Sequence, residues 1–141
     1  MRFTLVFSVL FLLISCKEKE VKKTNDNQNM IVKQSEMAAL MLKIFEVGAQ
    51  NKQLVLKGKF PKNYPENFTK IHSAVLTDPS DRDVAFKGLA DFYLLQQKEL
   101  YELRQKDFLI EQHNNVVNSC ISCHQVKCVG PIPRIKKLLI K

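Results

Sequence analysis

The chain has 141 residues, of which 22 are Lys or Arg and 14 are Asp or Glu, so its formal net charge is +8 at pH 7. This length suits one compact domain and excludes a multidomain assembly. The positive charge favours acidic partners or anionic surfaces. With only four glycines, no Gly-rich phosphate loop and no internal repeat, the sequence favours long helices.

The first 15 residues are expected to be a targeting signal that the mature protein lacks. Arg2 is their only charge, and residues 3–14 form an apolar run that suits a signal-peptide core and is too short for a membrane span. The run ends in Leu13-Ile14-Ser15-Cys16, which resembles the lipobox of bacterial lipoproteins. That resemblance implies cleavage before Cys16 and acylation of Cys16. An ordinary secretory signal followed by a chance cysteine is the alternative.

Residues 16–34 are then expected to be the lipidated cysteine and a flexible tether, and residues 35–141 the folded domain with a basic C-terminal tail. The tether is polar and charged, with few large apolar residues. Loss of Arg2 lowers the count of Lys and Arg from 22 to 21 against 14 acidic residues, a net charge of +7. Lys17 replaces the aspartate that marks inner-membrane retention in many lipoproteins, so the resemblance favours the outer membrane, on its periplasmic or surface face. Nucleic acid is not an expected partner of an exported chain.

Apolar residues recur at every third or fourth position over residues 34–57 and predict an amphipathic helix. This stripe comprises Met37, Leu40, Met41, Ile44, Val47, Gly48 and Leu54. Gly58 is expected to cap the helix, and two prolines hold the following loop open.

Three further helices are expected after this loop. The first covers residues 66–76, with inward-facing Phe68, Ile71, His72 and Val75. The next covers residues 80–105, with the stripe Ala85, Leu89, Phe92, Gln96, Leu100 and Leu103. The last covers residues 107–127, with Leu109, Val116, Cys120 and Cys123 on one side. No segment alternates like a β-strand, so we expect an all-α protein, an antiparallel four-helix bundle.

The last predicted helix carries Cys120-Ile-Ser-Cys123-His124, which is C-x-x-C-H, the attachment pattern of a c-type haem. Two thiols on adjacent helical turns add across the two vinyl groups of the porphyrin. The histidine that follows supplies an imidazole ligand to the iron. The sequence therefore predicts one haem c, held covalently by Cys120 and Cys123 and coordinated on its proximal side by His124.

Two other chemistries use the same residue types. A thioredoxin-like redox site needs a βαβ context, and no strands are expected here. A zinc site is the second alternative, with Cys120, Cys123, Cys128 and a histidine as its four ligands. Thiolate zinc is less natural outside the reducing cytosol. A zinc-stabilised lipoprotein that acts as an interaction module nevertheless remains the alternative from a different functional class.

A C-x-x-C-H on the last helix of a helical chain resembles class II cytochromes c, the cytochrome c′ group and its low-spin relatives. The resemblance covers about residues 34–128 and implies a four-helix bundle with covalent haem on the C-terminal helix. The segment "CHQVKC" with the following "GPIPRIKKL" also looks like small exported cytochromes of Bacteroidetes. Class II proteins usually carry an arginine soon after the haem histidine. This chain has Lys127 there, so contacts to the haem propionates stay open between Lys127, Arg134 and Lys136.

Antiparallel packing brings the end of the last helix beside the start of the first, which predicts Met37 and Met41 near the distal face of the haem. The resemblance implies a methionine as sixth ligand in low-spin members, and Met41 is preferred over Met37 because it lies farther from the fraying end. Both methionines acting only as core residues is the plain alternative. His72 is a further distal candidate, although such a residue is more often a hydrogen-bonded interior histidine.

These observations predict a membrane-tethered monohaem cytochrome that carries single electrons in the cell envelope and is not an enzyme. The expected partner is a redox protein with an acidic surface, and a homodimer stays open as the oligomeric state. The alternative within the haem class is a five-coordinate, cytochrome c′-like protein that binds nitric oxide or carbon monoxide.

The lipobox-like run gives the first testable prediction. Replacing Cys16 with Ser should abolish acylation and release the protein from the membrane fraction, because the thiol is the site of lipid attachment. Fractionation followed by mass spectrometry of the N-terminal peptide measures both effects. Unchanged membrane association of the intact Cys16→Ser protein would contradict the prediction.

Overall fold

The computed structural model describes residues 34–141, in which every regular element is helical. Three long helices form most of this region: α1 (Glu36–Leu56), α2 (Val84–Glu102) and α3 (Leu109–Lys127). The short elements are η1 (Glu66–His72), η2 (Pro79–Asp81), η3 (Lys106–Phe108), α4 (Ile132–Ile135) and η4 (Lys136–Leu138). The all-α expectation is confirmed, whereas the signal peptide, Cys16 and most of the tether lie outside the described residues.

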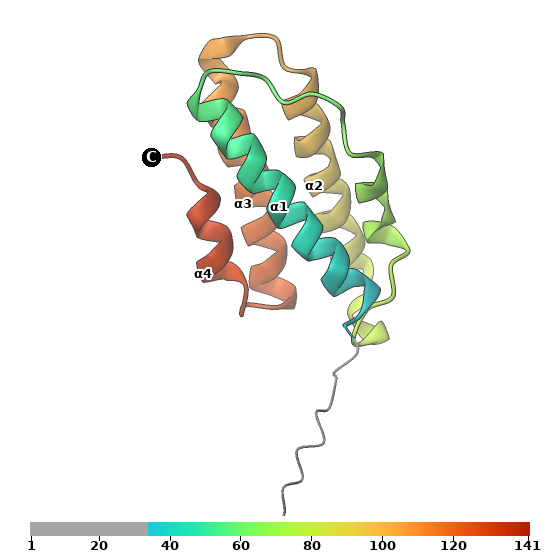
Figure 1. The fold of residues 1–141 in the computed structure, drawn as a ribbon. Helices are drawn as coiled ribbons and strands as arrows, with labels where there is room; N and C mark the ends of the chain where they lie inside the picture. Colours follow the sequence, from blue (N-terminus) through green and yellow to red (C-terminus); the bar gives the residue numbers. More distant parts are fainter. Residues whose placement is uncertain (1–33) are drawn as a thin grey trace, which may run out of the picture. The chain divides into compact units, whose positions relative to one another are not determined.

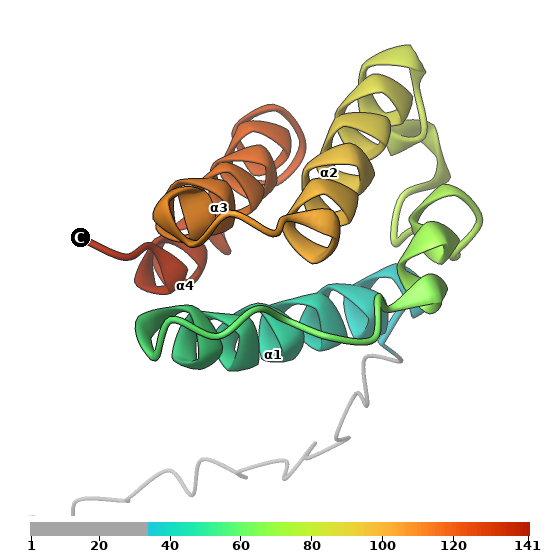
Figure 2. The same cartoon turned by 90° about the horizontal axis from the view of Figure 1, so that it is seen from above.

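Helices α2 and α3 form an antiparallel pair, and α1 packs across one side of it (Figures 1 and 2). The chain returns from the end of α1 to the start of α2 through a long segment that contains η1 and η2, so α1 and α2 run in the same direction and α3 runs in the opposite one. The start of α1 and the end of α3 therefore lie at the same end. None of the helices within residues 34–141 is long and apolar enough to cross a membrane.

Helix α1 follows its sequence prediction closely. Ser35 caps its N-terminus by accepting a hydrogen bond from the backbone N–H of Ala38 at 3.1 Å. Gly58 lies just beyond the C-terminus with φ +63°, a conformation that a glycine adopts without steric cost. The backbone N–H groups of Gly58 and Lys59 donate to the carbonyls of Val55 and Leu54, which completes a Schellman motif.

The predicted second helix is instead a 3-10 helix of seven residues. A 3-10 helix has three residues per turn, so Phe68, Ile71 and Ala74 align on one buried face at a spacing of three. The inward orientation expected for His72 and Val75 is therefore wrong, because it assumed the 3.6-residue period of an α-helix. Both side chains are exposed.

Helix α2 begins at Val84, later than predicted, because Asp83 provides the N-cap and accepts from the N–H of Phe86 at 2.8 Å. The predicted buried stripe of this helix is wrong, because at most positions the buried residue is the one that follows the predicted residue. The residues that face the core are Phe86, Ala90, Tyr93, Gln97 and Leu100. Apolar residues occur on both sides of this helix, so periodicity alone did not discriminate between the two faces.

The C-terminal tail folds back against α1 and α3, as α4 and η4 (Figure 2). Ile135, Leu138 and Ile140 are buried. Leu138 packs so closely on α1 that a Cβ atom added at Gly48 would lie 3.1 Å from its Cδ1.

Polar contacts also hold the tail in place. Lys52 Nζ donates to the carbonyls of Lys137 and Leu139 at 2.7 and 2.8 Å. Asn114 exchanges two hydrogen bonds of 2.9 Å with the backbone of Ile140. The tail is therefore an integral part of the domain.

His113 on α3 is buried beneath this tail. Its Nε2 lies 3.0 Å from the carbonyl oxygen of Leu138, so Nε2 carries the proton and donates it. Nδ1 is buried without a partner within residues 34–141. Burial lowers the pKa of His113 from its usual 6.5; the bond to Leu138 acts in the opposite direction, and the nearby charge of Lys52 lowers the pKa further.

The lowered pKa predicts that acid destabilises the domain through His113. Below pH 6.5 the imidazole of the unfolded chain takes up a proton more readily than that of the folded chain. The free energy of unfolding should therefore decrease as the pH is lowered, by at most about 1.4 kcal/mol per pH unit. His113→Gln keeps a donor for Leu138 and should reduce this dependence. Denaturant unfolding at pH 7.5, 6.5 and 5.5 measures it, with the exposed His72→Gln as control. Parallel curves for wild type and His113→Gln would contradict the prediction.

Candidate haem-binding site

The C-x-x-C-H motif occupies the last turns of α3, where helical geometry places its three side chains on one side. Cys123 and His124 lie three and four residues after Cys120, the spacings at which helical side chains are neighbours. All three residues are partly exposed. They line one cavity of about 450 Å³, a size typical of small-molecule and cofactor sites.

Helix α1 supplies the opposite wall of this cavity. Met37 and Met41, one turn apart on α1, both belong to its lining, together with Ile44 and Phe45. Met37 is buried and Met41 is partly buried. The structure thus brings Cys120, Cys123, His124 and the two methionines to a single cavity.

His72 does not lie in the lining of this cavity. It is exposed on η1, and its Nε2 lies 3.1 Å from Asp91 Oδ1 on α2. The structure therefore separates His72 from Cys120, Cys123 and His124 of the C-x-x-C-H motif.

The ring of His124 is oriented by the residue that ends α3. Its Nδ1 lies 3.0 Å from the carbonyl oxygen of Cys128, which adopts an extended conformation as the C-cap. A carbonyl oxygen only accepts, so Nδ1 carries the proton and the neutral ring has its lone pair on Nε2. This arrangement is typical of a metal-ligating histidine: one ring nitrogen donates to a backbone carbonyl, and the other is left to bind the metal.

The two motif thiols differ in their surroundings. Burial raises the pKa of Cys120 to about 12, and the neighbouring Cys123 adds to this effect. Burial also raises the pKa of Cys123, although the charge of Lys127 opposes it. Both sulfurs are therefore held as thiols at neutral pH when no metal is bound. Within residues 34–141, no three His, Cys, Asp or Glu side chains are grouped to hold a metal ion.

Helix α2 and the tail contribute further wall residues, of which the sequence indicated only Arg134 at the site, as one of three possible contacts to the haem propionates. From α2 they are Phe86, Leu89, Ala90 and Tyr93, and from the tail Pro131, Arg134, Ile135 and Leu138. The α2 face would have been found by placing the helical stripe one residue later. The tail has no such signal, because its position depends on long-range packing.

Tyr93 lines the cavity, and its hydroxyl is buried. Burial raises the pKa of Tyr93 well above its usual value, Cys120 raises it further, and nearby Gln97 lowers it. The Tyr93 hydroxyl and Gln97 Oε1 nevertheless lack partners of hydrogen-bond geometry within residues 34–141.

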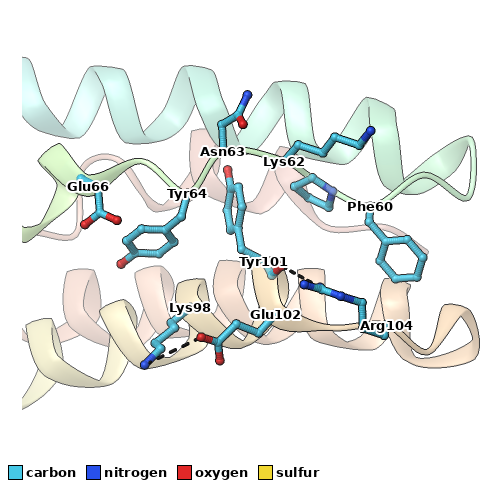
Figure 3. Close-up of a pocket in the computed structure, with 10 residues that line it drawn as sticks. Phe60, Lys62, Asn63, Tyr64, Glu66, Lys98, Tyr101, Glu102 and Arg104 are labelled. Atoms are coloured by element: carbon cyan, nitrogen blue, oxygen red, sulfur yellow. Dashed lines mark hydrogen bonds and ion pairs between the residues drawn. The ribbon is translucent and has the colours of Figure 1, made fainter.

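A second cavity of about 890 Å³ lies between the loop after α1 and the end of α2 (Figure 3). Tyr64 and Tyr101 meet there edge to face, with ring centroids 5.5 Å apart. Three of the charged side chains in its wall have partners: Lys98 pairs with Glu102 at 3.8 Å, and Arg104 donates to two backbone carbonyls. Its lining contains no cysteine, histidine or methionine.

The residues present around the smaller cavity fit a covalently attached haem. Two thiols and an imidazole with a free Nε2 line one cavity, its walls are mainly apolar, and Met37 and Met41 from α1 belong to the same lining. No protein-family model, no curated protein and no solved structure matches this chain.

Proposed function

We propose that the protein is a monohaem c-type cytochrome that carries single electrons in the cell envelope. One observation carries the proposal: a single cavity is lined by both thiols and the histidine of the C-x-x-C-H motif and, from α1, by Met37 and Met41. Met41 and His124 are 83 positions apart in the sequence and line the same cavity. Convergence of these residue types is what a six-coordinate haem requires.

Each residue has a defined task in this proposal. Cys120 and Cys123 would hold the haem by thiol addition to its two vinyl groups, each thiol hydrogen going to a vinyl carbon with no leaving group. His124 would supply Nε2 as the proximal ligand, while the carbonyl of Cys128 holds Nδ1. Met41 is the preferred distal ligand and Met37 the alternative. Haem iron supplies the one-electron chemistry, and methionine ligation raises its potential.

The fold supports a class II-like bundle. Helices α1, α2 and α3 have the directions of the first, third and fourth helices of such a bundle, and the segment with η1 stands in for the second (Figure 1). The C-x-x-C-H on the last long helix agrees with this arrangement.

A lipid anchor at Cys16 would hold the domain at a membrane of the envelope, with the outer membrane favoured. The surface near the motif suits an acidic redox partner. From residue 112 to the C-terminus the side chains include five cations, at positions 127, 134, 136, 137 and 141, and no Asp or Glu. Opposite charge accelerates encounter and orients the partner.

Loss of the two thiols tests covalent attachment. Cys120→Ala together with Cys123→Ala, produced in a host that matures c-type cytochromes, should give no haem stain on a denaturing gel and a lower melting temperature. A pyridine haemochrome spectrum and metal analysis of the wild type separate haem from zinc. Cys128→Ala is the matched control and should keep its covalent haem. A wild type with zinc and no haem would refute the proposal.

Coordination separates an electron carrier from a gas-binding protein. We expect low-spin iron in the wild type, with little uptake of carbon monoxide. Met41→Ala should convert the iron to high spin because it removes the thioether, and Met37→Ala should do so less completely or not at all. Absorption spectra with and without carbon monoxide measure this. A high-spin wild type would favour the nitric oxide or carbon monoxide binding function instead, and low-spin iron in both variants would contradict methionine ligation.

A further inference from the structure

Two cationic side chains line the cavity, and they differ in their surroundings. Lys127 comes from the last turn of α3, and Arg134 comes from α4 in the tail. Asp81 is the acidic residue in the same lining. A haem carries two carboxylates that neither the thiols nor the iron bind, so an available cation in the cavity lining is their natural partner.

The charge of Lys127 is already compensated. Its Nζ lies 2.6 Å from Asp83 Oδ2, and its side chain is only 15 % exposed. Asp83 is at the same time the N-cap of α2. The hydrogen bond from Lys127 is the largest cause of a lowered pKa at Asp83, so this carboxyl is held ionised as its partner. Asp83 therefore already neutralises the charge of Lys127.

Arg134 is exposed and has no such partner. Its guanidinium carbon lies 4.1 Å from the centroid of the Phe45 ring, which also lines the cavity. The side chain makes no hydrogen bond or ion pair with any other residue in the range 34–141. A cation–π contact uses no hydrogen-bond acceptor, so the N–H groups of the guanidinium remain available to bind a carboxylate in bidentate fashion.

The backbone of the tail gives Arg134 a defined position. Ile135, the next residue, is buried, and Leu138 packs against Gly48. Lys52 holds the carbonyls of Lys137 and Leu139. Lys136 and Lys137 follow on the exposed side and add positive potential. A guanidinium placed by a packed backbone loses little further freedom on binding.

We infer that Arg134 is the residue that binds the carboxylates of the cofactor, and that Lys127 instead joins α3 to the start of α2. The inference rests on the proposed function. It makes the tail a functional part of the site, because the segment after the motif supplies both a wall and the anion-binding cation.

The pH dependence of the midpoint potential of the haem-loaded, full-length protein tests the inference. Arg134→Gln should move the carboxylate-linked change in potential to higher pH by about one unit, because a nearby cation favours the ionised carboxylate. Lys127→Gln, the matched control, should give a much smaller shift. Arg134→Lys should restore most of the wild-type profile, since it keeps the charge.

Melting temperatures distinguish this role from simple packing. Phe45→Leu removes the stacking but keeps the guanidinium, so it should lower the melting temperature and leave the titration near that of the wild type. An equal or larger shift in Lys127→Gln, or no shift in Arg134→Gln, would overturn the assignment to Arg134 while covalent haem remains. A wild type without covalent haem would overturn this inference and the proposed function together, and the haemochrome spectrum identifies that case.

Discussion

Helices α1 and α3 pack in opposite directions, so the first turns of α1 face the last turns of α3 across an apolar space. The candidate site depends on this contact, because Met37 and Met41 reach the motif cysteines and His124 only in that arrangement. Two local features keep α1 in register. Ser35 defines where the helix begins, and Gly58 ends it with a left-handed residue.

The C-terminal tail stabilises this contact from outside. Burial of Ile135, Leu138 and Ile140 contributes about 1.5–3 kcal/mol for each side chain as an upper estimate. Hydrogen bonds from Lys52, Asn114 and His113 satisfy the tail's backbone carbonyls as it becomes buried. A short segment that combines basic and apolar residues thus becomes the fourth wall of a cavity.

The residues that end α3 determine the tautomer of His124 and the partner of Lys127. The chain leaves the helix at Cys128 in an extended conformation, and the carbonyl of that residue turns back to His124. This one hydrogen bond selects the tautomer with a free Nε2. Nearby, the ion pair of Lys127 with Asp83 connects the end of α3 to the start of α2. The C-terminus of α3 therefore affects both the tautomer of His124 and the position of α2 relative to α3.

Local sequence was sufficient for the helical class, for the extent of α1 and α3, for the glycine cap and for the motif, because periodicity, capping and short-range spacing are encoded over a few residues. It failed at η1, where three-residue spacing turned His72 outward, and on α2, where apolar residues on both faces left the buried one ambiguous. Tertiary structure alone decided that Tyr93 and the tail line the cavity, and that Lys127 has a carboxylate partner while Arg134 has an aromatic ring. Those contacts join residues from different elements, and their free energies depend on how the helices pack.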